Sequence, residues 1–268
     1  MKSIMERVWD GEKLTDLHII DMHCHMGPTN NYYFRGGCIE DMMADADTSG
    51  VEILCVSPHI GLDTSVIYGN EYSLDAIKKF PGRVYGMLMV NPNYPDECRS
   101  EIKKYYGMPE FNSFKIHPGS HGYNLNLPNY DIVFEAIMKQ GGFVLTHTWE
   151  GNNCGPAQCE DVIKRFPGVA FIMAHAGGMR ASTMKMIDLV NKYENAYIDT
   201  SGSEFSNVGL KYIMEHVDEN KMFFGSDMPY HDMRTGLSRV LFCDIPDKVK
   251  EKLLGGNYRA LMKKYPKK

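Results

Sequence analysis

The residues of this chain best suited to chemistry are two histidines, His23 and His25, shortly after the apolar run Leu17–Ile20. Side chains alternate between the two faces of a β-strand, so imidazoles two residues apart lie on the same face. Two imidazoles on one face supply half of a metal site. Three further potential ligands follow other apolar runs downstream, namely His147, His175 and Asp227. The sequence therefore predicts a metal centre assembled from the ends of several strands.

Nitrogen and oxygen ligands, with one position left for water, suit a catalytic zinc ion. Water on such an ion has its pKa lowered to about 7, which gives hydroxide at neutral pH, and a nearby carboxylate can accept the proton. Taken singly, a histidine at a strand end is more often a hydrogen-bonded core or rim residue, and Asp227 in the run Gly-Ser-Asp could cap a helix. Their joint position at strand ends favours metal chemistry.

The elements that must position these residues alternate between strand and helix. Eight apolar runs follow one another at intervals of roughly 30 residues, the length of a strand with its crossover helix. Residues 131–140, between two runs, carry apolar side chains at helical spacing and end at a glycine pair. The eight runs are Leu17–Ile20, Val51–Val56, Val84–Val90, Phe114–Ile116, Phe143–Thr146, Val169–Ala174, Ala196–Ile198 and Met222–Phe224.

We expect residues 1–268 to form a single α/β domain, a distorted (β/α)8 TIM barrel, with a last helix from 247 to about 265 that seals its exterior. The active site of such a barrel lies at the carboxyl ends of the strands, where all the candidate residues fall. A doubly wound open sheet is the alternative. It would place a glycine-rich phosphate loop after the first strand, where this chain has two histidines.

Composition limits the class of protein. Hydrophobic residues make up 43% and charged residues 24% of the 268 positions, with a net charge of −5, so a nucleic acid or an anionic membrane is not the expected partner. The seven cysteines are odd in number and form no CxxC pair, which predicts reduced thiols and a cytoplasmic protein. We expect neither a signal peptide nor a membrane helix.

Several stretches, in order along the chain, resemble the amidohydrolase superfamily, and within it the amidohydrolase-related branch of aminocarboxymuconate semialdehyde decarboxylase-like enzymes. The likeness covers almost the whole domain, and it is specific because the stretches occur together. They are Ile20–His25 (IDMHCH), Phe114–Pro118 (FKIHP), His147, Met173–Gly178 (MAHAGG), Tyr197–Ser201 (YIDTS), Phe224–Pro229 (FGSDMP) and Gly255–Arg259 (GGNYR).

The resemblance implies one divalent metal ion, with zinc expected and manganese as an alternative. The implied ligands are His23, His25, His147 and Asp227, and Asp227 would also move a proton. His175 would then be an acid/base or a donor that polarises the substrate.

Lys115 opens a second possibility. In binuclear relatives a lysine of the fourth strand is carboxylated and bridges two metals, and His175 becomes a ligand. We favour Lys115 as a buried charge below the site or as a substrate contact. By strand alternation we also expect Asp21 on the face of His23 and His25, only deeper, and Asp199 in a similar structural role.

Loop residues are expected to select the substrate. Arg35 and Arg180 are candidate anchors for a substrate carboxylate, because a guanidinium binds one bidentately, although each would equally suit a solvated surface position. We expect the pocket to be lined by residues at or just after the strand ends, namely His117, Trp149, Tyr230 and His231.

The expected function is that of a metal-dependent hydrolase, in which metal-activated water attacks an amide, ester or lactone of a small, carboxylate-bearing substrate. The alternative is a non-oxidative, metal-dependent decarboxylase (carboxy-lyase) of a small aromatic or unsaturated acid. A metal-binding protein without turnover is a third reading, and the intact Asp227 and His175 argue against it. The resemblance also implies a homodimer or homotetramer.

Overall fold

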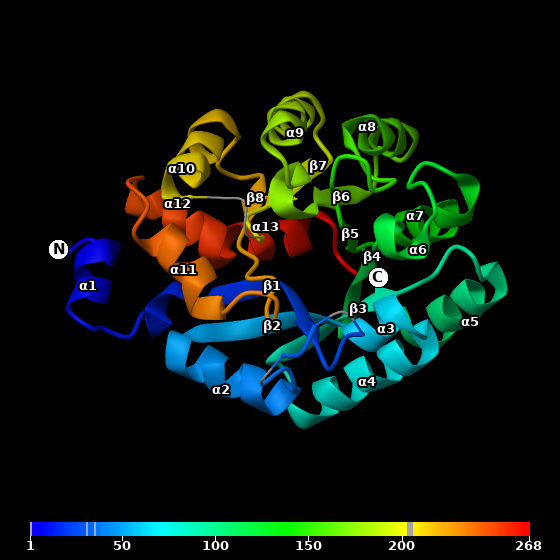
Figure 1. Cartoon of the computed structure of the whole chain (residues 1–268), viewed down its shortest axis with the longest axis horizontal. Coiled ribbons are helices and arrows are strands. Elements are labelled where there is room, and N and C mark those ends of the chain that lie inside the picture. Colours follow the sequence, from blue (N-terminus) through cyan, green and yellow to red (C-terminus); the bar gives the residue numbers. More distant parts are fainter. Residues whose placement is uncertain (1, 31, 35, 203–205) are drawn as a thin grey trace.

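Eight parallel strands form a nearly closed barrel in the computed structural model, which describes residues 2–30, 32–34, 36–202 and 206–268. Each strand pairs with the next one along the chain, from β1 to β8 (Figure 1). This order confirms the expected (β/α)8 architecture. The strands are β1 Ile19–Met26, β2 Val51–Pro58, β3 Val84–Met89, β4 Phe111–Ile116, β5 Phe143–Thr146, β6 Ala170–Met173, β7 Ala196–Asp199 and β8 Met222–Phe223.

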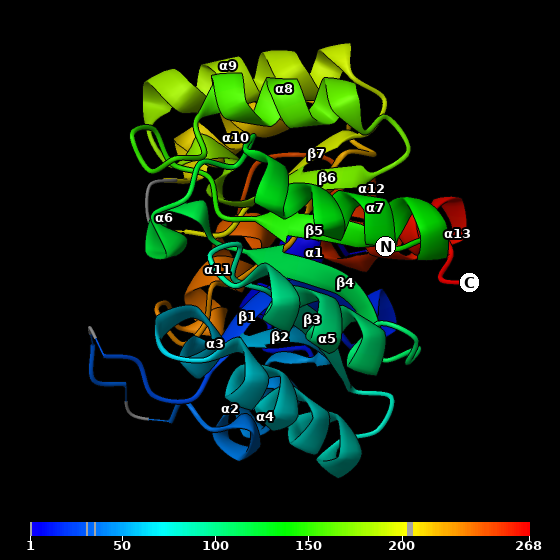
Figure 2. The same cartoon turned by 90° about the vertical axis from the view of Figure 1, so that its right-hand side faces the viewer.

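Helices connect the strands and cover the outside of the barrel, with α8 and α9 on one flank and α2 and α4 on the opposite one (Figure 2). The α-helices are α1 Ile4–Trp9, α2 Ile39–Ser49, α3 His59–Asp63, α4 Val66–Lys79, α5 Pro95–Tyr105, α6 Pro118–His121, α7 Asp131–Gln140, α8 Pro156–Arg165, α9 Arg180–Lys192, α10 Asn207–His216, α11 Met233–Leu241, α12 Asp247–Glu251 and α13 Asn257–Lys264.

The last helical stretch differs from the single helix expected. It consists of α12 and α13 joined by a π-helical turn, η4 Lys252–Gly256. The described residues also form 3-10 turns at η1 Thr15–Leu17, η2 Pro128–Tyr130 and η3 Ala174–Gly177. Among the described residues, no helix combines the length and apolar character needed to cross a membrane.

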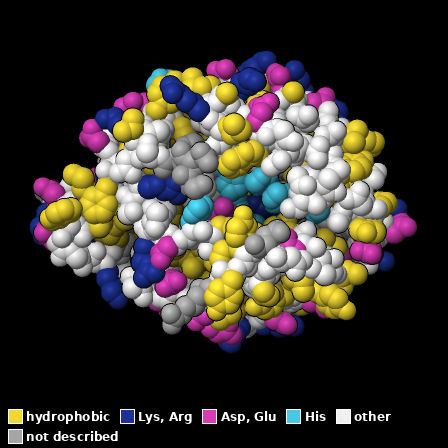
Figure 3. Space-filling model, viewed as in Figure 1, with side chains coloured by type: hydrophobic (Ala, Val, Ile, Leu, Met, Phe, Trp, Pro, Cys, Tyr) yellow, Lys and Arg dark blue, Asp and Glu magenta, His cyan; other side chains and the backbone are white. Residues whose placement is uncertain are grey.

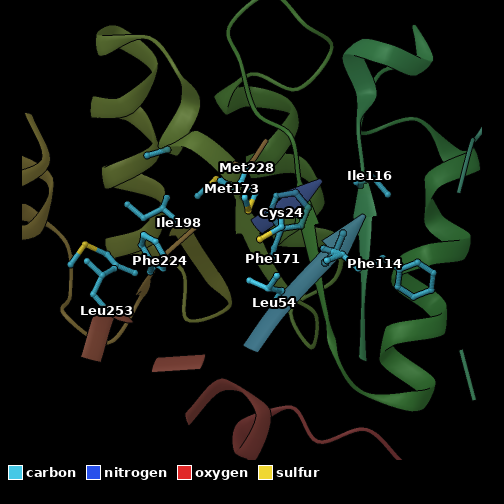
Figure 4. Packing of buried hydrophobic residues seen from close by; sticks show 14 of the residues in the cluster. Cys24, Leu54, Phe114, Ile116, Phe171, Met173, Ile198, Phe224, Met228 and Leu253 are labelled. Carbon is cyan, nitrogen blue, oxygen red and sulfur yellow. The ribbon is translucent and has the colours of Figure 1, made fainter. Parts of the chain in front are cut away.

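The strands bury both of their faces. Outward side chains such as Leu54, Phe114 and Phe171 pack against the helices (Figure 4). Inward side chains such as Phe143 and Tyr197 fill the lower part of the barrel. Because most positions on both faces are apolar, strands such as β6 (AFIM) are continuous hydrophobic runs in the sequence, as parallel strands usually are.

A β-bulge interrupts the alternation of β1. Asp21 lies opposite Leu54 of β2 and Cys24 lies opposite Val56, so three steps on β1 match two on β2. Ile20 and Met22 therefore belong to the inner core, and after the extra residue the inward positions are His23 and His25. The prediction that Asp21 shares the face of these histidines was wrong. Asp21 is in register with the outward-facing Leu54, because the bulge shifts the alternation by one residue.

The segment after β8 closes the barrel against β1. Met22 N–H donates to Phe224 O at 3.1 Å, Asp227 N–H donates to His23 O at 2.9 Å, and His25 N–H donates to Met228 O at 2.6 Å. These bonds place Asp227 directly beside the two histidines of β1.

Candidate metal centre

The carboxyl ends of the strands bring most of the predicted residues to one cavity of about 680 Å³. Histidine side chains gather at the bottom of the central hollow of this face (Figure 3). The predicted residues that line the cavity are His25, His117, His147, Trp149, His175, Asp227, Tyr230 and His231. His23 and Lys115 are buried at the ends of β1 and β4, in contact with each other and with this cluster.

His23, His25 and Asp227 form the tightest part of the cluster. The Nε2 atoms of the two histidines are 3.3 Å apart, and each lies 3.4 Å from Asp227 Oδ1. One nitrogen of His175, one of His23 and one oxygen of Asp227 all lie within 4.8 Å of one another, close enough to share one ion.

The partners of the other ring nitrogens fix the tautomers of these two histidines. His23 Nδ1 lies 2.7 Å from Asp199 Oδ2, and His25 Nδ1 lies 2.9 Å from the carbonyl oxygen of Ser57. A carboxylate and a carbonyl only accept, so both Nδ1 atoms carry the proton and both Nε2 atoms are bare. Two unprotonated ring nitrogens and a carboxylate oxygen thus face one another, and Lys115 Nζ lies 2.6 Å from the nitrogen of His23.

That arrangement fits a cation. Lone pairs held 3.3–3.4 Å apart repel unless a positive charge lies among them. Lys115 Nζ lies 2.6 Å from one of the three atoms, His23 Nε2, whereas a divalent ion would serve all three. Metal-bound histidines ordinarily donate their second N–H to a carboxylate or a carbonyl, as His23 and His25 do here. The donor set therefore fits a divalent ion such as zinc.

His175 is oriented in the same way through Ser201. The hydroxyl of Ser201 donates to Asp199 Oδ1 at 2.6 Å, so its oxygen accepts from His175 Nδ1 at 2.9 Å. This leaves His175 Nε2 bare, 3.2 Å from His147 Nδ1. The hydrogen bonds thus prepare His175 Nε2 as a ligand or base, just as they prepare His23 and His25.

His147 and His117 form a stacked pair, with ring centroids 3.9 Å apart and planes inclined by 10°. Ser120 N–H donates to His117 Nδ1 at 3.1 Å, where His117 precedes α6. The proton of neutral His117 is therefore on Nε2, which makes this ring a hydrogen-bond donor. The ring of His147 lies at hydrogen-bond distance from one described side chain, that of His175.

Burial keeps the imidazoles neutral. It lowers the pKa of His25 and of His175 to about 4, and it lowers the pKa values of His147 and His117 well below the ordinary value. A metal ligand must be an unprotonated imidazole, so this cavity supplies ligands in the required state at neutral pH.

The two carboxylates stay ionised. Burial by itself would raise the pKa of Asp227, but the attraction of its carboxylate to the adjacent histidines in their protonated form, His175 foremost, outweighs burial and holds the pKa well below the ordinary value. For Asp199, burial is likewise outweighed, in this case by His23, and the pKa falls to about 2. A carboxylate that binds a metal must be ionised, and so must a carboxylate that accepts a hydrogen bond from a metal-bound histidine.

Lys115 is the cation of the cluster. Its Nζ lies 2.6 Å from His23 Nε2, and burial lowers its pKa to about 8. It is only 1% exposed and is in contact with the ligand candidates rather than with the open cavity. This position agrees with the expectation of a buried charge below the site.

Aromatic side chains form one wall of the cavity. Tyr230 packs edge-on against His25, His59 and Phe34, with centroids 4.9–5.8 Å apart. Trp149 lies against the backbone of Gly178, where a Cβ would come within 2.2 Å of the indole. Only glycine leaves room for Trp149 at that place.

The two arginines proposed as carboxylate anchors have different outcomes. Arg35 lies outside the described residues. Arg180 is exposed at the start of α9 and lines a separate cavity of about 550 Å³ with Met184, Val208 and Tyr212. Arg180 is therefore not among the residues that surround the histidine cluster.

Sequence reasoning missed three residues that shape the site. His59 follows β2 directly and stacks on His25, so the rule that singled out the other strand-end histidines would have found it. Ser201 gave no signal of its own, because its role depends on a contact between the segment that follows β7 and η3, which follows β6. Ser57 acts through its carbonyl, which no side-chain motif reveals.

Solved structures with the same fold include both decarboxylases and a hydrolase. The 5-carboxyvanillate decarboxylase of Sphingomonas paucimobilis has a TM-score of 0.70 at 17% identity, over 92% of this chain and 99% of that one. The 5-carboxyvanillate decarboxylase of Novosphingobium aromaticivorans, complexed with manganese, has a TM-score of 0.65 at 16% identity, over 83% and 79%. A Pseudomonas putida protein described as a 2-pyrone-4,6-dicarboxylic acid hydrolase has a TM-score of 0.66 at 16% identity, over 92% and 98%.

At these identities the structures establish the fold, and no curated protein matches the sequence. The family itself follows from a sequence model. The amidohydrolase model matches residues 20–263, from the start of β1 into α13. The resemblance noted in the sequence is thereby confirmed, and the chain belongs to the amidohydrolase family.

Proposed function

We propose that the chain is a metal-dependent hydrolase that cleaves an ester, lactone or amide bond of a small molecule bound above Asp227. The observation that carries this proposal is that the unprotonated nitrogens of His23 and His25 and one carboxylate oxygen of Asp227 lie within 3.4 Å of one another, with each histidine held by a partner at its Nδ1. Family membership supports a metal-dependent enzyme.

The proposed ligands are those expected from the sequence, His23, His25, His147 and Asp227, and zinc is the proposed ion because nitrogen ligands dominate. Manganese is the alternative, since it is bound in the Novosphingobium decarboxylase. A bound divalent ion supplies a Lewis acid that polarises a carbonyl and lowers the pKa of water.

The side chains of the cavity divide the remaining work. In the proposed reaction the oxygen of water bonds to the substrate carbonyl carbon, and the bond from that carbon to the leaving oxygen or nitrogen breaks. Asp227 takes the proton of the water on a carboxylate oxygen and passes it to the leaving atom. His175 Nε2, bare and backed by Ser201, orients the water, and His117 Nε2–H donates to the substrate carbonyl.

The decarboxylase is the second candidate, because two of the compared structures are 5-carboxyvanillate decarboxylases. That reaction needs a cationic group to hold a substrate carboxylate. Among the described residues that line the cavity there is no lysine or arginine, and Arg180 lies on a different cavity. The described lining therefore favours the hydrolase.

A paired substrate screen in H2¹⁸O tests the proposal. Metal-loaded protein is given small lactones, esters and amides in one panel and hydroxybenzoates in the other, with Asp227→Asn as the inactive control. Hydrolysis incorporates ¹⁸O into a new product carboxylate, whereas decarboxylation releases CO2. Release of CO2 without ¹⁸O-labelled carboxylate in any reaction would replace the hydrolase by the decarboxylase.

A further inference from the structure

Asp21 is a buried carboxylate to which the mechanism above gives no role. It is fully buried on the outer side of β1, at the bulge. Its Oδ1 accepts from the N–H of Ser226 at 2.9 Å and from the N–H of His23 at 3.2 Å. One of these residues is a proposed ligand, and the other directly precedes the ligand Asp227.

The bulge is what allows β1 to serve two purposes. Without it, His23 and His25 would lie on the face opposite Ile20 and Met22, and the strand could not send both pairs into the barrel. A bulge leaves a backbone group without its ladder partner. At this bulge the N–H of His23 is satisfied by the carboxylate of Asp21 instead.

The loop that carries Asp227 is also under constraint. Asp227 has φ +63°, a left-handed conformation that costs a residue with a side chain of order 1 kcal/mol. Neighbouring bonds maintain it: Asp227 N–H donates to His23 O, and Met228 N–H donates to Ser226 Oγ at 3.0 Å. The Ser226 N–H bond to Asp21 is the anchor at the entrance to this turn.

From these contacts we propose that Asp21 is a positioning residue for the metal centre. One oxygen, Oδ1, accepts from β1 and from the β8 loop at once, and so sets the distance between the imidazole of His23 and the carboxylate of Asp227. Without that acceptor, two buried N–H groups lose their partner, and the turn at Asp227 can relax to an ordinary conformation that moves its carboxylate from the histidines. The proposal rests on the metal site of the proposed function.

The geometry also indicates that the acceptor atom, rather than the negative charge, is what matters. Asp21 Oδ2 has no hydrogen-bond partner among the described residues. An asparagine can therefore keep Oδ1 in place and put its amide where Oδ2 lies. A leucine of similar shape fills the volume without any acceptor.

The test compares Asp21→Asn and Asp21→Leu by zinc affinity, measured by competition with a chromophoric chelator. We expect Asp21→Leu to bind zinc at least about tenfold more weakly and to have an altered cobalt absorption spectrum, while Asp21→Asn stays within about threefold of the wild type. Asn195→Ala is the matched control: it removes another buried side chain that bonds backbone groups, at Ile163, Phe166 and Val169, and should leave zinc affinity unchanged.

Amide hydrogen exchange in the metal-free protein separates this inference from the proposed function. Asp21→Leu should lose protection at the amides of Ser226 and His23, whether or not any metal binds. Wild-type affinity and unchanged exchange in Asp21→Leu would overturn the proposal. If the leucine variant does not fold, a tenfold loss of zinc affinity in Asp21→Asn would overturn the proposal, because it would show that the negative charge of Asp21 is required. A wild type that binds neither zinc nor manganese would instead contradict the proposed function.

Discussion

Replacing Asp199 by asparagine should weaken metal binding through the tautomer of His23. Asp199 is fully buried at the end of β7. Its Oδ1 accepts from His175 N–H at 2.7 Å, from Ser201 N–H at 3.1 Å and from the Ser201 hydroxyl. Its Oδ2 accepts from His23 Nδ1 at 2.7 Å.

The asparagine has only one favourable orientation. The two backbone N–H groups need an acceptor, so the amide oxygen takes the place of Oδ1 and the NH2 group points at His23 Nδ1. Two donors cannot share that contact, so His23 shifts its proton to Nε2, toward Asp227 and the proposed ion. Outer partners of this kind change metal affinity by about 10- to 100-fold, or roughly 1.4–2.7 kcal/mol.

Two measurements on the purified variant check this reasoning. Zinc affinity is measured by chelator competition, and the tautomer of His23 is identified in the metal-free protein by ¹⁵N–¹H spectra of the histidine rings. Glu101→Gln is the matched control, because Glu101 is also a buried carboxylate, accepting from Asn70 at 2.8 Å, and is not part of the metal cluster. A folded Asp199→Asn that binds zinc as tightly as the wild type would refute the tautomer argument.

Three other substitutions test separate parts of the account. Lys115→Ala should leave the metal content at one ion per chain by elemental analysis; loss of a second ion would instead establish a binuclear site. Gly225→Ala should cost about 1–3 kcal/mol in chemical denaturation and weaken metal binding, because its Cβ would lie 2.6 Å from His23 Cβ, while Gly107→Ala, with nothing within 4 Å, should do neither. Burial lowers the pKa of His121 to about 4, so the unfolded chain takes up a proton first as the pH falls from 6.5 to 4, and stability is lost in that window. The free energy of unfolding, measured by denaturation at pH 7 and pH 4, should fall on acidification by up to about 3 kcal/mol less in His121→Asn than in the wild type. An equal fall in the two proteins would contradict this prediction.

The fold could be predicted from the sequence because each strand of the barrel is buried on both faces. The run Val169–Ala174 is apolar throughout and Val84–Val90 contains no charged residue, and the regular spacing of the runs indicates one crossover helix each. The position of the site followed from the same pattern, since the carboxyl ends of parallel strands meet at one rim. His147 and Asp227 are far apart in the sequence, and the rim explains why both reach the same cavity.

Details that depend on contacts between strands could not be predicted. The bulge at Asp21 changes which side chains face inward, and strict alternation gave the wrong face for that residue. The link from Asp199 through Ser201 to His175 joins the end of β7 and the residues after it to η3, which follows β6. Sequence spacing does not show which oxygen meets which ring nitrogen, so the tautomers became evident only from the structure.

The most direct test of the central claim is the metal content of the protein, purified without chelators and desalted, by elemental mass spectrometry. The bare imidazoles of His23 and His25 beside Asp227 predict about one divalent ion per chain, with zinc as the proposed metal. Substitution of Asp227 by asparagine should lower the affinity for that ion. Wild-type protein that contains no metal, and that still binds none after incubation with zinc or manganese, would contradict the account.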